Sequence, residues 1–235
     1  MSEVSAISLP KMVTKAESQN PKILVLYGPP KIGKTTMASK LENNLVLDLE
    51  DGSRFLDIMK MKVDSLDHLK QIGREVIKAG RPYKYITLDT ITLLEEWCET
   101  EATRKYKESI IGKNFTGNSI LSLPNGAGYG LLREEVMPYV RNILPMLAEN
   151  IIIIGHLKDK FIVDKKGTEV AAKDIDLIGK LRNMVCAQAD AVGYLYRENE
   201  QLMVSFDTKE TVVCGSRCEH LKGQTFPFDW KKIYI

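Results

Sequence analysis

The chain has no long apolar run, few cysteines and almost no net charge. Its longest clean apolar run, residues 151–154, is far shorter than the ~20 residues that a membrane-spanning helix needs, so we expect no contact with a membrane. The first residues show no basic segment followed by an apolar one, so we expect no secretory signal and a cytoplasmic location. A net charge of +2 says little about partners, because a nucleic-acid binder of this balance would have to concentrate its basic residues locally.

The chain has four cysteines, and without a secretory signal we expect free thiols. Cys214, Cys218 and His220 have a C-x-x-x-C-x-H spacing that could hold a metal. No second pair of ligands follows at zinc-finger spacing, so ordinary residues near strand ends are favoured over a structural zinc site. The other two cysteines, Cys98 and Cys186, stand alone.

Residues 28–35 read Gly-Pro-Pro-Lys-Ile-Gly-Lys-Thr and match the phosphate-binding P-loop pattern G-x-x-x-x-G-K-[ST]. An apolar run at 23–27 precedes the motif and a helix-like stretch at 35–41 follows it, which favours a real site over a chance match in a βα turn. We expect the glycines to let the backbone wrap around phosphate oxygens, Lys34 to reach the β- and γ-phosphates, and Thr35 to ligate Mg²⁺. The predicted cofactors are ATP and Mg²⁺, and the predicted binding residues are Gly28, Pro29, Pro30, Lys31, Ile32, Gly33, Lys34, Thr35 and Thr36.

Carboxylates at the ends of two apolar runs complete the expected catalytic set. The run at 85–88 ends in Asp89, which would hold Mg²⁺ together with Thr35; the alternative is an N-cap for the helix that starts at 91. The run at 45–49 leads into Glu50 and Asp51, at the sheet edge where parallel α/β proteins bind ligands. Either acid could polarise the attacking water, with Glu50 preferred; the alternative is a solvated acidic turn closed by a glycine.

A third candidate, His156, follows the strand at 151–154. At this position it could sense the γ-phosphate, although a lone histidine is more often a hydrogen-bonded structural residue. Lys34, Glu50 and His156 are therefore the predicted catalytic residues.

The order of apolar patterns predicts an α/β fold with a mostly parallel central sheet flanked by helices, and antiparallel strands near the C-terminus. Residues 1–21 are polar and are expected to form an arm outside a core at 22–235. Helices are expected at 65–79 and 91–107, a long loop at 112–130, and a mostly helical segment at 131–149 that Pro138 and Pro145 interrupt. A charged stretch occupies 157–182, and the alternation at 191–196 and 201–206 predicts a hairpin.

These motifs together resemble the RecA/RadA core ATPases. In that family the strand after the P-loop helix ends in Asp-x-Glu with the glutamate as base, here Asp48-Leu49-Glu50, and the next strand ends in Asp-Ser or Asp-Thr, here Asp89-Thr90. His156 stands where RecA carries a glutamine. The chain is most similar to small phage-encoded RecA-like single-strand annealing recombinases of the Sak-four type. The resemblance implies a RecA-like P-loop core and the cytoplasm of a bacterial host during phage infection.

The resemblance also implies single-stranded DNA as a partner, bound by two loops at 110–130 and 157–181. Basic residues would track phosphates and aromatic residues would stack on bases. The alternative for the second loop is a solvated hairpin around residues 164–167. The predicted DNA-binding residues are Lys113, Phe115, Lys158, Lys160, Phe161, Lys165 and Lys166.

In this family ATP lies between protomers, so the resemblance implies a homo-oligomeric ring or filament, with a single-stranded-DNA-binding protein as a further partner. Arg217 and Lys222 are candidates for the cations that a neighbour supplies in trans, with surface charge as the alternative. The leading function is a DNA-stimulated ATPase that promotes annealing or recombination. The alternatives are a nucleotide-binding replication adaptor or helicase loader, and a small-molecule kinase, which the absence of arginine from residues 109–130 disfavours.

Overall fold

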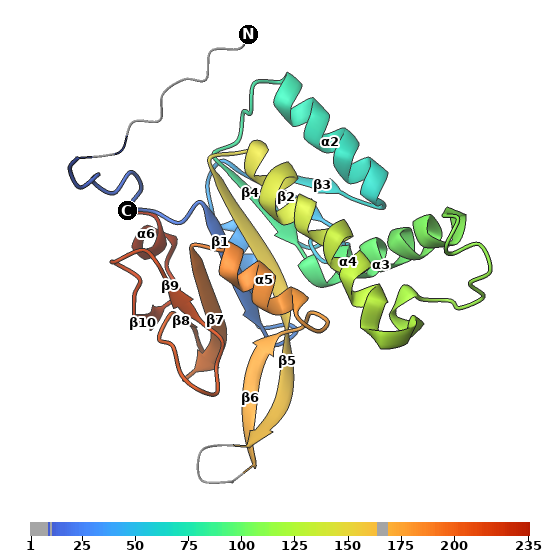
Figure 1. The fold of residues 1–235 in the computed structure, drawn as a ribbon. Helices are drawn as coiled ribbons and strands as arrows, with labels where there is room; N and C mark the ends of the chain where they lie inside the picture. The colour runs from blue at the N-terminus through green and yellow to red at the C-terminus, as the bar shows by residue number, and fades with distance from the viewer. Residues whose placement is uncertain (1–8, 10, 164–168) are drawn as a thin grey trace.

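The computed structural model describes residue 9 and residues 11–163 and 169–235. Its sheet has the strand order β10-β8-β7-β1-β5-β4-β2-β3 (Figure 1). The strands β7, β1, β5, β4, β2 and β3 are all parallel. β8 and β9 pair with β7 in antiparallel fashion, as does β10 with β8 and β6 with β5. The predicted α/β class, with antiparallel strands near the C-terminus, is confirmed. The strands are β1 (Ile23–Gly28), β2 (Asn44–Asp48), β3 (Lys60–Lys62), β4 (Tyr85–Asp89), β5 (Asn150–Val163), β6 (Glu169–Ile175), β7 (Ala191–Glu198), β8 (Gln201–Ser205), β9 (Gly215–Ser216) and β10 (Thr225–Pro227).

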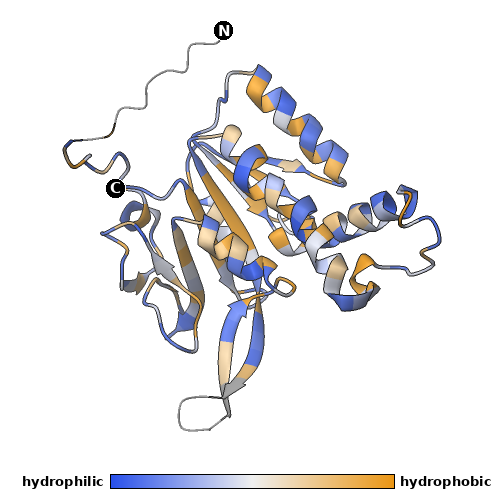
Figure 2. Cartoon of the chain, in the orientation of Figure 1, coloured by the Kyte–Doolittle hydropathy of each residue, from blue (hydrophilic) through white to orange (hydrophobic). Residues whose placement is uncertain are grey.

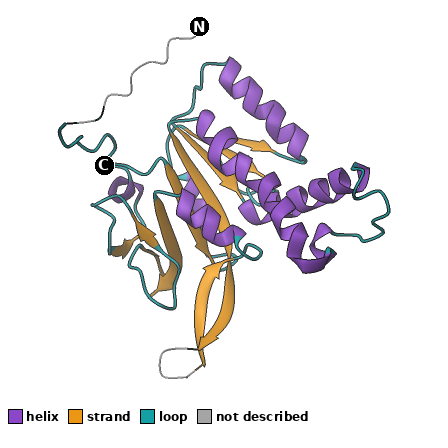
Figure 3. Ribbon diagram, in the orientation of Figure 1, coloured by secondary structure: helices purple, strands orange, loops and turns teal. Residues whose placement is uncertain are grey.

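Helices cover the two faces of the sheet unequally (Figure 3). One face packs against the four longer helices through side chains such as Leu69, Leu94, Val136 and Val185. The other face packs against the short P-loop helix and the C-terminal segment. The helices are α1 (Lys34–Ser39), α2 (Leu66–Lys78), α3 (Ile91–Glu108), α4 (Ala127–Pro138), α5 (Leu181–Gln188) and α6 (Trp230–Ile233), with short 3-10 turns at Ile120–Ser122, Pro124–Gly126 and Leu144–Met146 and a π-helical turn at Tyr139–Ile143.

The central strands are buried on both faces, as expected for parallel strands covered by helices. β1, β2 and β4 are buried along their whole length, and their hydrophobic colour stands out in Figure 2. Since every parallel strand ends at the same edge, the residues after β1, β2 and β4 and within β5 are brought together there.

Most expected helices are found, and their ends have clear local causes. Ser65 caps α2 by accepting a hydrogen bond from the backbone amide of His68 at 3.2 Å. Helix α4 gives way to a π-helical turn and then a 3-10 turn over residues 139–146, in agreement with the interruption expected from the prolines. The long loop expected at 112–130 is shorter than predicted, because two 3-10 turns and the start of α4 occupy its second half.

The charged stretch after residue 156 differs most from expectation. β5 does not end at Ile154 but continues to Val163 and pairs with β6 in an antiparallel hairpin that projects from the sheet (Figure 1). The expected hairpin of β7 and β8 is confirmed. No helix among the described residues is long and apolar enough to cross a membrane.

Candidate nucleotide site

The P-loop runs from the end of β1 into the first turn of α1, as the motif predicts. Gly33 has a φ of 110°, in the region that favours glycine, and a Cβ there would meet nothing within 4 Å. Gly28 is required for a different reason: a Cβ would lie 2.6 Å from the backbone carbonyl oxygen of Leu195 on β7. Gly33 thus serves the loop conformation, whereas Gly28 serves the close packing of β1 on β7.

Lys34 lies inside the P-loop rather than in solvent. It is 7% exposed, and its Nζ donates hydrogen bonds to the carbonyl oxygens of Gly28 at 2.9 Å and Pro29 at 2.8 Å. Burial lowers the pKa of Lys34, and the carboxylates of Asp89 and Glu50 oppose that shift. The ammonium group is therefore held at the centre of the loop, where phosphate oxygens could replace the two carbonyls as acceptors.

Thr35 and Asp89 meet at the end of β4, as predicted for a Mg²⁺ site. The Thr35 hydroxyl donates a hydrogen bond of 2.7 Å to Asp89 Oδ2. Burial raises the pKa of Asp89 to about 6, despite the opposing hydrogen bond from Thr35. A hydroxyl and a buried carboxylate are hard oxygen ligands, so the pair fits Mg²⁺. The alternative reading of Asp89 as an N-cap is wrong, because Thr90 caps α3 by accepting from the amide of Leu93 at 3.4 Å.

Glu50 and His156 face each other across the end of the sheet. His156 Nε2 lies 3.2 Å from Glu50 Oε1, which also accepts a hydrogen bond of 2.7 Å from the Thr90 hydroxyl. The hydrogen bond with His156 lowers the pKa of Glu50 and raises the pKa of His156. Glu50 is therefore an ionised carboxylate with one oxygen fixed by two partners, at a position open to solvent.

The neighbouring acids of the same turn point elsewhere. Asp48 accepts hydrogen bonds from the backbone amides of Gly52 and Ser53 and from the Ser53 hydroxyl, so it shapes the turn after β2. Asp51 instead pairs with Arg54 of the same turn and Lys62 of β3, in a partly buried position. Of these three acids, Glu50 alone contacts the predicted catalytic set. No local pattern assigns the turn-forming role to Asp48, and the contact of Thr90 with Glu50 was not predicted.

The predicted DNA-binding residues differ in how exposed they are and in which groups they contact. Lys113 and Phe161 are exposed, and Lys158 pairs with the exposed Asp176 at 3.0 Å. Lys160 instead lies 2.6 Å from the fully buried Asp174, and Phe115 packs edge-on against Tyr106. Lys165 and Lys166 lie outside the described residues.

The two candidate trans cations lie away from the P-loop. Arg217 contacts Asp190, whose carboxylate accepts hydrogen bonds from the backbone amides of Lys22 and Ile23. Arg217 is therefore at the amino ends of β1 and β7, at the edge opposite the P-loop. Lys222 lies 3.7 Å from Glu219 on the surface.

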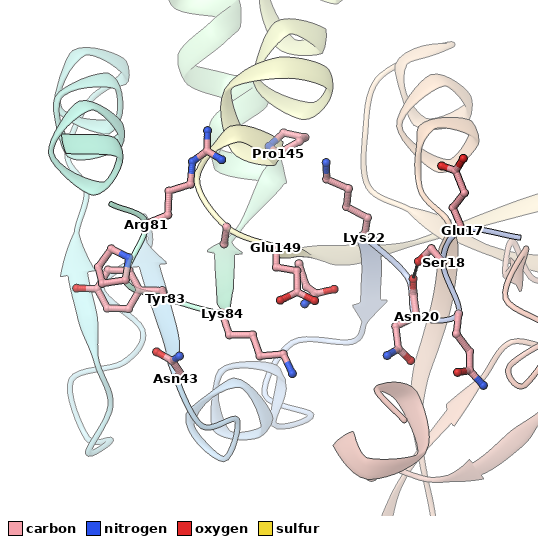
Figure 4. A pocket seen from close by; sticks show the side chains of 14 residues that line it. Glu17, Ser18, Asn20, Lys22, Asn43, Arg81, Tyr83, Lys84, Pro145 and Glu149 are labelled. Atoms are coloured by element: carbon pink, nitrogen blue, oxygen red, sulfur yellow. Dashed lines mark hydrogen bonds between the residues drawn. The ribbon is translucent and has the colours of Figure 1, made fainter. Parts of the chain in front are cut away.

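A cavity of about 880 Å³ also lies at this opposite edge. Figure 4 shows its lining side chains, with Glu149 between Arg81, Lys84 and Lys22, and Glu17 farther to the right. These residues precede the strands rather than follow them, so the cavity is separate from the nucleotide site.

The four cysteines are free, and no group of three metal-ligating side chains occurs in the part of the chain that the structure describes. His220 has its Nε2 2.9 Å from the backbone carbonyl oxygen of Ile233, which ties it to the C-terminal segment.

Comparison with known proteins identifies the family of this chain. A model of the family described as AAA domain matches residues 20–218. The search of curated proteins finds no match. Among solved structures, the chain is similar to a KaiC-like protein from the hyperthermophilic archaeon Pyrococcus horikoshii OT3, with 15% identity, a TM-score of 0.41, and coverage of 90% of this chain and 87% of that chain. The fold assignment therefore rests on the strand order of the chain itself.

Proposed function

The chain belongs to the AAA-domain family and is a P-loop nucleotide-binding protein; we propose that it hydrolyses ATP with Mg²⁺ and couples this reaction to single-stranded DNA. One observation carries the proposal. The buried Lys34, the Thr35–Asp89 pair and the ionised Glu50 converge at the carboxyl edge of the sheet, from α1, β4 and the turn after β2. This is the combination of phosphate ligand, metal ligands and base that hydrolysis requires.

Each residue has a role that follows from its position. The P-loop amides and Lys34 would hold the phosphates, and Thr35 and Asp89 would hold Mg²⁺, which when bound neutralises charge on the phosphate oxygens. Glu50 would accept a proton from the attacking water, because its pKa is lowered and the carboxylate is therefore available as a base at neutral pH. His156 and Thr90 fix the orientation of that carboxylate.

The DNA part of the proposal is supported by the β5–β6 hairpin. The hairpin continues directly from His156 on β5, so the nucleotide site and the hairpin share one strand. Lys158 and Phe161 on the hairpin and Lys113 after α3 offer cations and an aromatic ring to a single strand. We further propose that the protein acts as a homo-oligomer in annealing or recombination, with Arg217 or Lys222 of one copy reaching the nucleotide of the next.

The test measures ATP hydrolysis with and without single-stranded DNA for the wild type, Lys34→Ala and Glu50→Gln. We expect Lys34→Ala to lose nucleotide binding, and Glu50→Gln to keep binding but lose hydrolysis by roughly 10²- to 10⁴-fold, the usual contribution of a general base. Asp51→Asn is the matched control and should hydrolyse normally. Normal hydrolysis by Glu50→Gln would refute the assignment of the base. Tight ATP binding by the wild type without hydrolysis would favour the adaptor function instead.

A further inference from the structure

A second cavity opens directly beside the P-loop, between α1 and the C-terminal segment. Its volume is about 420 Å³, within the range of small-molecule sites. Gly33 and Thr36 of the P-loop line one wall, Arg197 at the end of β7 lines another, and Phe228 and Trp230 close it from the C-terminal segment. The cavity shares Gly33 and Thr36 with the P-loop, so it adjoins the place where the loop would hold phosphates.

The sheet order fixes which end of the nucleotide enters this cavity. Glu50 follows β2, Asp89 ends β4 and His156 lies on β5, and these three strands all lie on one side of β1. These residues define the end where the γ-phosphate is cleaved. The cavity lies on the other side of β1, next to β7 and β8. A triphosphate with its γ-phosphate at Glu50 therefore directs its nucleoside toward the cavity.

The C-terminal wall of the cavity is held in place before any ligand binds. The indole N–H of Trp230 donates a hydrogen bond of 2.7 Å to the carbonyl oxygen of Met37 in α1. The amide of Phe228 donates to the carbonyl oxygen of Leu202 at 2.8 Å, and the rings of Phe228 and Trp230 meet edge to face at 4.9 Å. The arrangement presents rigid aromatic surface next to the phosphate site, and a preformed wall reduces the entropic cost of binding.

We propose that this cavity binds the base and ribose of the nucleotide, with the ring of Phe228 as the stacking surface for the base. Residues 227–231, which form this wall, lie beyond the range 20–218 that the family model matches. Base–aromatic stacking provides affinity without demanding one particular base. The guanidinium of Arg197, anchored on the carbonyl oxygens of Glu200 and Ile32, adds a planar cation at the rim.

The inference rests on the proposed nucleotide site. Two probes distinguish failure of the base-binding cavity from failure of the nucleotide site itself. MgATP contains a base, whereas magnesium tripolyphosphate presents the same phosphates without one. We expect Phe228→Ala to weaken MgATP binding by about 5- to 100-fold and to leave tripolyphosphate binding unchanged, as measured by calorimetry. Lys34→Ala should weaken both. If the wild type binds neither probe, the proposed function fails, and the inference fails with it.

Two results would overturn the inference while leaving the proposed function intact. One is equal affinity of the wild type for MgATP and tripolyphosphate, and the other is unchanged MgATP binding by Phe228→Ala. Phe226→Ala is the matched control, because its ring packs against Phe206 and does not line the cavity. If Phe228→Ala does not fold, Phe228→Leu keeps the apolar bulk without the ring and should show the same loss.

Tryptophan fluorescence gives an independent measurement on a protein with the pocket intact. The chain has two tryptophans, and Trp97 lies on α3 on the other face of the sheet. In Trp97→Phe, the emission of Trp230 should change on addition of MgATP but not of tripolyphosphate. An identical response to both probes would contradict the placement of the base.

Discussion

Replacing Asp89 by asparagine should stabilise the metal-free protein while destroying its Mg²⁺ site. Asp89 is 4% exposed and lies near Glu50 and Asp48, and burial is the main reason that its pKa rises to about 6. Thr35 donates the hydrogen bond to Asp89, and an asparagine carbonyl oxygen can accept it equally well. The substitution therefore removes a charge that the folded protein holds at a cost, without removing its hydrogen bond.

The size of the effect follows from the difference between the ordinary pKa of 3.8 and the folded value of about 6. At about 1.4 kcal/mol for each pH unit, the ionised carboxylate costs the fold about 3 kcal/mol at neutral pH. The folded state binds the proton more tightly than the unfolded state, so the cost is absent below about pH 4, grows as the pH rises to about 6, and is constant above that. Because asparagine does not titrate, the gain in stability of Asp89→Asn over the wild type should increase over the same pH range.

The assay is chemical denaturation of the wild type and Asp89→Asn without Mg²⁺, at a series of pH values from 4 to 8. We expect the variant to gain up to about 3 kcal/mol in the free energy of unfolding at pH 8 and little at pH 4. Asp51→Asn, at a carboxylate paired with Arg54 and Lys62, is the control and should gain nothing. A loss of stability at pH 8, or a gain that does not depend on pH, would refute the reasoning. In the wild type, Mg²⁺-dependent ATP affinity should fall as the pH drops below about 6, because protons then compete for the same oxygens.

Two further predictions concern packing around the site. Gly28→Ala should lower the free energy of unfolding by about 1–3 kcal/mol in denaturant titrations, because its Cβ would lie 2.6 Å from a backbone oxygen of β7, whereas Gly52→Ala meets nothing and should be neutral. Lys160→Ala should cost about 1–3 kcal/mol in the same assay, because it removes a partner of the buried Asp174, while Lys158→Ala should cost less than about 1 kcal/mol. Equal stability of the two lysine variants would show that the buried pair contributes nothing.

The sequence was sufficient for the parts of the site that depend on local chain order. The P-loop, its strand and its helix are contiguous, so the positions of Lys34 and Thr35 follow from the motif alone. The position of Asp89 follows from a rule about parallel strands, because β4 ends at the same edge as β1. The same rule places Glu50 and His156 at that edge.

The sequence could not decide which neighbouring group does what at that edge. Asp48, Glu50 and Asp51 all lie within one turn, and their different roles depend on backbone amides and cations whose positions only the folded turn defines. In the sequence Thr90 is only the residue that follows Asp89, yet in the structure it caps α3 and its hydroxyl donates to Glu50. One hydroxyl therefore serves the helix end and the candidate base, and no local pattern shows this.

The aromatic wall beside the P-loop depends on contacts between residues that are still farther apart in the sequence. Trp230 and Met37 are 193 residues apart in the chain, and the hydrogen bond between them exists only because β7 and β8 carry the C-terminal segment back past β1. The same path leads on to Ile235, whose backbone amide and carbonyl both bond to the side chain of Asn20. The C-terminal segment thus joins the P-loop helix to the start of the core. Any ligand that contacts Phe228 contacts a segment anchored at both of these points, so base binding and the stability of the C-terminal segment should rise together.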